Sequence, residues 1–405
     1  MEQANFKVYG YRWAVQLAFM VVVVMNQLLW ITFAAITSDA MGFYHVSDLE
    51  IGLLSLSFMV VYLFISFPAA WVIDTYGIRA GVGIGAALTG FFGLLRGLAG
   101  ANYTWVLIAQ IGIAVGQPFI LNAITTVAAR WFPPSERATA SGLSSLAMYL
   151  GILLGLALTP YLVLTSGIPG MLLIYGGVAA LAMALFFLLA RERPPSPPCP
   201  PELEARSLVL DGLNKMIRQR DFIFLMLVFF VGLGAFNAIT TWIEQILAPR
   251  GFSATQAGDA GGLMILGGII GAVALPLLSD RIHKRVPFLI LAVVGASAGL
   301  TGFIFGTSYW ALLLASFCFG FFLLSAGPIG FQYGAEITYP APEGTSNGLL
   351  LLMGQISGIL FILGMDALKA PGTGSMSLPL LVLMALMFVA LIVATRLREA
   401  AAIRS

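Results

Sequence analysis

The sequence predicts an all-α integral membrane protein in which twelve transmembrane helices form two pseudo-symmetric bundles of six. Two observations carry this prediction. First, 60% of the 405 residues are apolar and 9% are charged, with a mean hydropathy of +0.97, whereas soluble domains carry about 25% charged residues. Second, a shift of 206 residues places Asp74 on Asp280 and Arg79 on Arg285. A long, apolar internal repeat indicates two related halves of a membrane protein.

The individual spans follow from length and apolar content. A membrane-spanning helix needs about 20 mostly apolar residues. In the first half this predicts spans at 13–38, 51–73, 79–99, 103–128, 140–165 and 169–190. In the second half it predicts spans at 221–247, 256–279, 286–306, 309–334, 345–367 and 377–396. Residues 1–190 and 221–405 are therefore expected to form the two bundles.

The segment 191–220 is the longest polar stretch and is expected to join the bundles in the cytoplasm. Its Pro-rich part, RPPSPPCPP, favours an extended linker, and residues 202–220 have the amphipathic spacing of a helix on the membrane surface. If both termini are cytoplasmic, 17 of the 20 Lys and Arg residues fall on the cytoplasmic side, as the positive-inside rule requires. We therefore expect a multi-pass protein of the inner or plasma membrane with both termini inside.

Charged residues gather in two repeat-related loops, at 70–79 and 278–285. In each loop an acidic residue at a helix end is followed by bases in a tight turn, which favours an ion-pair latch that breaks and reforms as the halves rock. The alternative is a solvated loop that its positive charge keeps inside. The residues of the predicted latch are Asp74, Arg79, Asp280, Arg281 and Arg285.

A second repeat-related pair of loops lies at 130–142 and 336–348. Prolines end the incoming helix because they cannot donate to its hydrogen-bond ladder, and Ser or Thr then caps the next helix. Locally, these residues are therefore expected to end one helix and begin the next. The charged members are expected to add ion pairs between helices on the cytoplasmic side: Arg130, Glu136, Arg137, Glu336 and Glu343.

Several motifs resemble one known family. The run EITYPAPEGTSNGLL, followed by GQISGILF, is very similar to helices 10 and 11 of the feline leukaemia virus subgroup C receptor-related transporters, which belong to the major facilitator superfamily. NQLLW, FPAAWVID and GQPFILNAITTVAARWF resemble the same family, so the resemblance covers nearly all of the chain. It implies the major facilitator fold, alternating access, and choline, ethanolamine or haem as solutes. Ala70 and Thr75 depart from the superfamily's loop pattern, and the short loops favour a prokaryotic member.

Four residues suited to a small organic cation lie 10 to 17 residues into their predicted spans, near the bilayer midplane: Trp30, Gln117, Phe236 and Gln355. Aromatic faces attract quaternary ammonium groups, and side-chain amides can bond a hydroxyl group. The resemblance implies that Trp30, Gln117 and Gln355 match positions lining the choline site of the relatives, while Phe236 replaces a Tyr. Helix packing and interhelical hydrogen bonds are the alternative roles. Further candidates are Asn26, Tyr149, Asn237 and Trp242.

The charged residues within the predicted spans indicate whether solute transport is coupled to proton movement. No acidic residue falls clearly at the midplane, which favours facilitated diffusion, with an inside-negative potential drawing a cation inward. Glu244 lies about 12 Å further outward than Phe236. It could attract cations at an outer gate or carry a coupling proton, or it could be an interfacial carboxylate in water. A proton-coupled transporter or exporter of another solute stays open, as does a non-transporting membrane receptor or sensor.

Other function classes lack support. His45 and His283 lie in loops, so no midplane His offers axial ligation to haem. No phosphate-binding Gly-rich motif and no Ser-His-Asp set indicates an enzyme, and no basic tract with interleaved aromatics indicates nucleic-acid binding. We therefore expect a monomer that contacts a small solute and the lipid bilayer, without a cofactor, a metal ion or a nucleic-acid partner.

Overall fold

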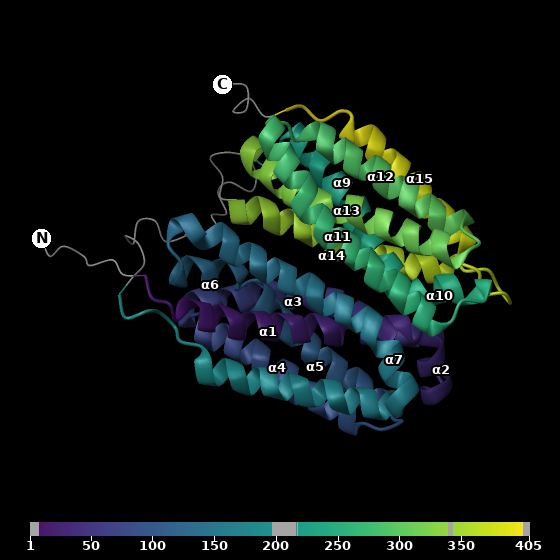
Figure 1. Cartoon of the computed structure of the whole chain (residues 1–405), viewed down its shortest axis with the longest axis horizontal. Coiled ribbons are helices and arrows are strands. Elements are labelled where there is room, and N and C mark those ends of the chain that lie inside the picture. The colour runs from purple at the N-terminus through teal and green to yellow at the C-terminus, as the bar shows by residue number, and fades with distance from the viewer. Residues whose placement is uncertain (1–7, 197–215, 217, 339–342, 400–405) are drawn as a thin grey trace, which may run out of the picture. The chain divides into compact units, whose positions relative to one another are not determined.

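The computed structural model describes residues 8–196, 216, 218–338 and 343–399, which contain helices and no strand (Figure 1). Two compact units form: unit 1 holds residues 1–33 and 39–207, and unit 2 holds 34–38 and 208–405. The described part contains 11 helices long and apolar enough to cross a membrane. One of these, α7 (Pro134–Leu189), has 56 residues and is non-helical at Gly167, with φ 67° and ψ 173°. It therefore comprises the predicted spans 140–165 and 169–190, so all twelve predicted spans are present.

Unit 1 is built around α7, whose two halves pack against α1 and α4, while α5 packs between α3 and α4. Its core is formed by aliphatic side chains together with Phe19, Phe132 and Phe186, which are all buried. Most of the predicted surface helix at 202–220 falls outside the described residues. The further elements of unit 1 are α1 (Arg12–Ile31), η1 (Thr32–Ala35), α2 (Thr37–Tyr44), α3 (Asp48–Tyr76), α4 (Ile78–Leu98), α5 (Tyr103–Leu121) and α6 (Ile124–Trp131).

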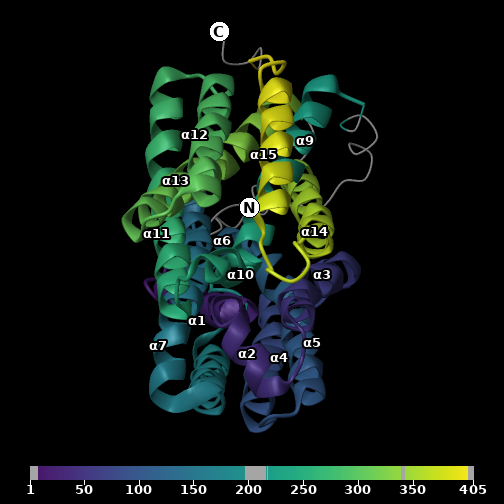
Figure 2. The same cartoon turned by 90° about the vertical axis from the view of Figure 1, so that its right-hand side faces the viewer.

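Unit 2 repeats these pairings with its own helices. In it α13 packs between α11 and α12, while α9 packs against α14 and α15 (Figure 2). A Cβ atom at Gly320 of α13 would overlap the carbonyl oxygen of Met264, so α11 and α13 approach with backbone in contact. The elements are α9 (Arg220–Thr241), α10 (Ile243–Leu247), η4 (Ala248–Arg250), α11 (Ala254–Ile282), α12 (Val286–Phe305), α13 (Tyr309–Thr338), α14 (Glu343–Ala367) and α15 (Ser377–Ala394).

The internal repeat is also visible in the way that the second span of each unit begins. The Ser47 hydroxyl accepts the Glu50 N–H at 3.3 Å, and the Glu50 carboxylate accepts the Ser47 N–H at 2.8 Å. Ser253 and Gln256 form the same reciprocal pair, at 3.3 and 3.0 Å. Each pair satisfies two N–H groups that a helix start leaves unpaired. The same local chemistry therefore fixes the start of α3 and of α11.

Three of the predicted spans, at 13–38, 103–128 and 221–247, are present, but each contains a short interruption of its helix. The helix ends at Ile31 in α1, at Leu121 in α5 and at Thr241 in α9. Hydroxyl groups compete for backbone carbonyls near two of the breaks: Thr32 donates to Leu28 at 2.8 Å, and Thr240 donates to Phe236 at 2.6 Å. Near the third, Pro118 lacks the N–H that would continue the ladder.

Candidate functional site

Trp30 lies in the last turn of α1, one residue before the helix ends. Its side chain is 6% exposed. The indole N–H donates to the Ser55 carbonyl of α3 at 3.1 Å, and the Phe58 ring lies 6.5 Å away at a tilt of 47°. The hydrogen bond uses the only polar group of the indole and fixes its plane. An oriented aromatic face beside a helix end is the arrangement that a cation–π contact requires.

The backbone that carries Trp30 is held by two buried polar side chains. The guanidinium group of Arg96, from α4, is fully buried and donates to the Leu29 carbonyl at 2.9 Å and to the Thr32 hydroxyl at 3.4 Å. Gln110, from α5, donates to the carbonyls of Leu29 and Trp30 and accepts a third Arg96 hydrogen bond at 2.6 Å. These donors replace the helical partners that the break removes, so they position the end of α1.

Gln117 precedes Pro118 in α5 and is 5% exposed. Among the described residues, six side-chain amides are buried: Gln16, Asn26, Gln27, Gln110, Gln117 and Asn237. Five of them donate a hydrogen bond within the protein. The amide of Gln117 makes no such bond with any described residue. Its amide atoms are not among the fully enclosed polar atoms that lack a partner, so they stay accessible and can bond a polar ligand.

In unit 2, Phe236 and Gln355 come from neighbouring helices. Phe236 lies near the end of α9 and is 6% exposed. The next residue, Asn237, donates to the Gly354 carbonyl of α14 at 3.1 Å, which brings the chain at Phe236 beside the chain at Gln355. Gln355 is half-buried, and its amide makes no hydrogen bond with a described residue. Unit 2 therefore places an aromatic ring and an unpaired amide on adjacent helices.

The remaining candidates fall into two groups, according to whether their polar side-chain groups already form hydrogen bonds within the protein. The Asn26 amide donates to the Thr89 hydroxyl at 3.1 Å and is fully buried. Trp242 is fully buried at the break between α9 and α10, and its indole N–H donates to the Ile362 carbonyl at 3.1 Å. Tyr149 is half-buried, and its hydroxyl makes no hydrogen bond with a described residue. Tyr149 thus resembles Gln117 and Gln355, whereas Asn26 and Trp242 have structural partners.

Glu244 is the one carboxylate with a buried side chain in the described part of the chain, at 3% exposed. It lies on α10, just after the break that ends α9. Its carboxylate accepts the N–H of Ser38 at 2.9 Å, and residues 34–38 group with unit 2. Because Ser38 lies in the first turn of α2, Glu244 satisfies an N–H group that the helix start leaves without a helical partner.

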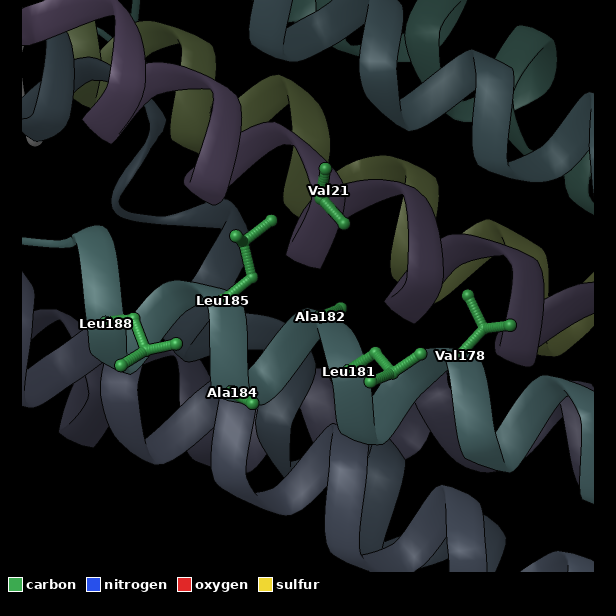
Figure 3. A pocket seen from close by; sticks show the side chains of 7 residues that line it. All are labelled: Val21, Val178, Leu181, Ala182, Ala184, Leu185 and Leu188. Atoms are coloured by element: carbon green, nitrogen blue, oxygen red, sulfur yellow. The ribbon is translucent and has the colours of Figure 1, made fainter.

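Unit 1 also carries a groove of about 380 Å³ that is lined only by apolar side chains. It lies between α1 and the second half of α7 (Figure 3), and its walls are aliphatic: Val21, Val178, Leu181, Ala182, Ala184, Leu185 and Leu188. No side chain in it can donate or accept a hydrogen bond. The groove therefore offers nothing to a polar solute, and its chemistry suits lipid acyl chains.

At the end of unit 1 where α4 begins, several charged residues gather around Glu192, which follows α7. The Glu192 carboxylate accepts the N–H groups of Ile78 at 3.1 Å and Arg79 at 2.8 Å, at the start of α4, and pairs with the Arg130 side chain. A carboxylate at a helix N-terminus is favoured by the helix dipole. Asp74 is exposed, and it forms no ion pair with Arg79 or with another described residue. The Arg79 charge itself is exposed, and only its backbone joins this cluster.

Two further pairings fix the entry to α7. Arg12 of α1 pairs with Glu136, with 3.0 Å between Nε and Oε2. Arg137 donates to the carbonyls of Phe132 at 3.3 Å and Ala129 at 3.1 Å, near the end of α6. The segment between α6 and α7 is thereby tied both to α1 and to the helix that precedes it.

Unit 2 carries a related cluster with a different arrangement of charge. The Arg285 side chain pairs with Asp280 and with Glu336, the latter at 3.2 Å. Glu399, after α15, accepts the N–H groups of Arg285 at 3.1 Å and Val286 at 2.9 Å, as Glu192 does at α4. Burial alone would lower the pKa of the Arg285 guanidinium, but the hydrogen bonds to Asp280 and Glu336 raise the pKa above its usual value.

The two neighbouring arginines of this loop are expected to differ in their contribution to stability. Arg285→Gln leaves Glu336, which is 15% exposed, without its cation and should lower the free energy of unfolding by about 1–3 kcal/mol. Arg281 is exposed and forms no ion pair with a described residue. Arg281→Gln should therefore change the free energy of unfolding by less than about 0.5 kcal/mol. Chemical unfolding in mixed micelles measures both changes in the free energy of unfolding, and equal losses would contradict the assigned pairing.

Of the charged residues predicted to form ion pairs at 336–348, the side chain of Glu343 lies outside the described residues.

Sequence reasoning missed several residues that hold these sites together. Glu192 and Glu399 each follow an Arg a few residues after the last helix of their half, and this repeated Arg-Glu pair was a usable signal. The sequence marks Arg96 only as a charged residue inside the predicted span 79–99. Gln110 and Ser55 carried no signal, because their roles depend on which backbone carbonyls the neighbouring helix leaves unpaired.

Comparison with known proteins places this architecture in a family. The sequence profile of the Major Facilitator Superfamily matches residues 17–362. Solute carrier family 49 member A3 of Danio rerio is 33% identical over 383 residues, which cover 91% of this chain and 81% of that protein. The choline/ethanolamine transporter FLVCR2 of Homo sapiens is 28% identical, covering 88% and 71%, and FLVCR1 of Mus musculus is 30% identical, covering 87% and 69%.

Solved structures agree on the fold. A bacterial homologue of the human lysosomal transporter Spinster has a TM-score of 0.75 at 16% identity, covering 98% of this chain and 100% of that one. A D-xylose–proton symporter has a TM-score of 0.75 at 14% identity, covering 96% and 99%. Together with the two six-span units and the sequence match, these findings show that the chain belongs to the major facilitator superfamily, among the feline leukaemia virus subgroup C receptor-related transporters.

Proposed function

We propose that this membrane transporter moves a small organic cation, choline or a related amine, by alternating access. The observation that carries the proposal is the buried amide of Gln117, which makes no hydrogen bond with a described residue although the other buried amides all do. This amide is accessible rather than fully enclosed, and it lies inside a membrane span, where a polar side chain is a candidate for function. A solute that bonds it during transport explains why it is kept. The relatives named choline/ethanolamine transporters point to the same class of solute.

The side chains on each unit match the parts of choline. A quaternary ammonium group is bulky and weakly hydrated, so the faces of Trp30 and Phe236 can attract it without removing a tight water shell. The amides of Gln117 and Gln355 can each donate to and accept from the hydroxyl group at the other end of the molecule. The Tyr149 hydroxyl is a further donor. We propose that the substrate contacts this set as the units alternate.

Facilitated diffusion is the transport mode that we propose. A cation is driven inward by about 2.3 kcal/mol for every 100 mV of inside-negative potential, so no second ion is needed for accumulation. Proton coupling is the alternative, and it would use Glu244, the buried carboxylate on α10. Its bond to the Ser38 N–H gives this carboxylate a structural role, which favours the uncoupled mode.

The proposed substrate class is tested by ligand-dependent thermal unfolding of the purified protein. A ligand present at 100 times its dissociation constant adds about 2.7 kcal/mol to the free energy of unfolding. Choline and ethanolamine should raise the melting temperature, whereas betaine, which carries an added carboxylate, should raise it less. Stabilisation by an anion or a sugar, with none by any amine, would overturn the proposal.

Replacing both amides should separate recognition of the hydroxyl group from recognition of the cation. In Gln117→Leu/Gln355→Leu, choline affinity should fall roughly tenfold, as the loss of about 1.4 kcal/mol of hydrogen bonding implies. Tetramethylammonium, which has no hydroxyl group, should bind the variant as well as it binds the wild type. Calorimetric titration of both ligands measures the difference. An equal loss for the two ligands would assign the amides a structural role instead.

A further inference from the structure

A second pocket with different chemistry lies on unit 1, next to the segment that follows α7. It has a volume of about 250 Å³ and is lined by Tyr9, Tyr11, Trp131, Arg191, Arg193 and Pro195. The lining thus combines three aromatic rings with two arginines and contains no acidic side chain. We call it the Arg191 pocket.

The walls of the Arg191 pocket are fixed by hydrogen bonds. The Tyr11 hydroxyl donates to the Leu189 carbonyl at 2.9 Å, and the Trp131 indole donates to the Arg191 carbonyl at 3.2 Å. The Tyr9 hydroxyl donates to the Ser196 hydroxyl at 3.3 Å. These bonds tie the non-helical segment after α7 to α1 and α6. The shape of the pocket is therefore fixed by hydrogen bonds within unit 1.

The Arg191 side chain is oriented for binding an anion. Its guanidinium carbon lies 4.7 Å from the centre of the Tyr11 ring, so one face of the group is covered. Stacking leaves the N–H donors at the edge of the plane, the geometry with which arginine recognises phosphate. Arg191 is exposed and forms no ion pair with a described residue. Arg193 is exposed and lines the same pocket.

The acidic residue between the two arginines does not pair with Arg191. The chain is non-helical at 191–193, and Arg191 and Arg193 line the pocket while Glu192 does not. The Glu192 carboxylate is instead engaged by the start of α4 and by Arg130. The pocket therefore concentrates positive charge on the face that the distribution of Lys and Arg assigns to the cytoplasm.

We propose that the Arg191 pocket binds a phosphate group, supplied by an anionic lipid of the inner leaflet or by a soluble phosphate. Basic pockets beside membrane helices on the cytoplasmic side bind anionic headgroups, and aromatic residues are enriched at that depth. The volume suits a headgroup and is too small for a whole lipid. The site is separate from the proposed substrate site, since none of its residues belongs to that set.

Titration of the full-length protein in neutral detergent tests this proposal with three probes: short-chain phosphatidylglycerol, short-chain phosphatidylcholine and sodium phosphate. Native mass spectrometry and thermal unfolding report binding. Phosphatidylglycerol should bind saturably, whereas phosphatidylcholine, which has no net charge, should bind more weakly. If sodium phosphate stabilises the protein as well as phosphatidylglycerol does, the soluble source is supported. If only the lipid acts, the lipid source is supported.

A matched pair of double variants separates the pocket from general surface charge. Arg191→Gln/Arg193→Gln should weaken phosphatidylglycerol binding by roughly tenfold or more. Arg396→Gln/Arg398→Gln removes the same charge from exposed arginines that follow α15 as Arg191 and Arg193 follow α7, and it should leave that binding unchanged. Equal losses in the two variants, or no loss in either, would overturn the proposal.

A charge-conserving variant keeps the test decisive if the first double variant does not fold. Arg191→Lys retains the positive charge but loses the planar group that stacks on Tyr11. Phosphatidylglycerol binding should weaken severalfold at unchanged net charge. Full affinity in Arg191→Lys, together with full affinity in any folded variant that lacks Arg193, would contradict recognition by this pocket.

Discussion

Replacing Trp30 by alanine is expected to weaken choline binding roughly thirtyfold, because a desolvated cation–π contact contributes about 2 kcal/mol or more. The indole is 6% exposed, and its N–H is held by the Ser55 carbonyl, so its aromatic face has a fixed orientation. Trp30→Phe keeps an aromatic face but loses that hydrogen bond, and it should show a smaller loss. Calorimetric titration with choline measures all three affinities.

The control for this experiment is Trp310→Ala. Trp310 is 78% exposed on α13, so its removal changes the same amount of side chain without touching the proposed site. Its choline affinity should equal that of the wild type. The unliganded melting temperature of each variant separates a loss of binding from a loss of folding. Wild-type affinity in a folded Trp30→Ala protein would contradict the aromatic recognition of the cation.

Arg96→Met is expected to cause the largest loss of stability, about 3 kcal/mol, because hydrogen bonds to charged groups contribute about 1.5–3 kcal/mol. Its guanidinium is fully buried and donates to the Leu29 carbonyl, the Thr32 hydroxyl and the Gln110 amide oxygen. Methionine fills similar space without donors, so the Gln110 amide oxygen loses its partner and the Leu29 carbonyl keeps only its bond from Gln110. Denaturant-induced unfolding in mixed micelles, followed by tryptophan fluorescence, measures the change.

Arg250→Met is the matched comparison. Arg250 is half-buried and reaches the carbonyls of Gly306 and Ile304 only at 3.5 and 3.3 Å. Its replacement should lower the free energy of unfolding by less than about 1 kcal/mol. Equal stability of Arg96→Met and the wild type would show that the end of α1 does not depend on Arg96. It would also remove the proposed support for Trp30.

The spans and the repeat were predictable because they depend on properties that the sequence carries locally. Apolar runs of spanning length identify the helices, and Pro, Gly and charged loops separate them. The breaks after Ile31 and Thr241 were not predictable, since threonine residues also occur inside continuous helices, as Thr89 does in α4. Whether a hydroxyl interrupts a helix depends on what binds the freed carbonyls, and at α1 that is decided by Arg96 and Gln110, 64 and 80 positions away in sequence.

For the proposed site, the sequence could indicate residue type and approximate depth but not whether a polar group is already engaged. Asn26 and Gln117 look equivalent as amides within apolar spans. In the structure Asn26 bonds to Thr89, whereas Gln117 makes no hydrogen bond with a described residue. The difference arises from packing between helices distant in sequence, which residue spacing does not encode. The roles of Glu192 and Glu399 were not predictable for the same reason, because they depend on which helix starts lie beside these carboxylates in the folded protein.

The most direct test of the transport proposal is uptake of radiolabelled choline into proteoliposomes with an imposed inside-negative potential of 100 mV and no pH gradient. For an uncoupled cation, a driving force of about 2.3 kcal/mol corresponds to roughly fiftyfold accumulation. We expect accumulation that approaches this ratio, collapses when the potential is dissipated, and falls sharply in Trp30→Ala. No accumulation of choline under the potential, or accumulation only when a pH gradient is imposed, would contradict potential-driven transport of a choline-like cation.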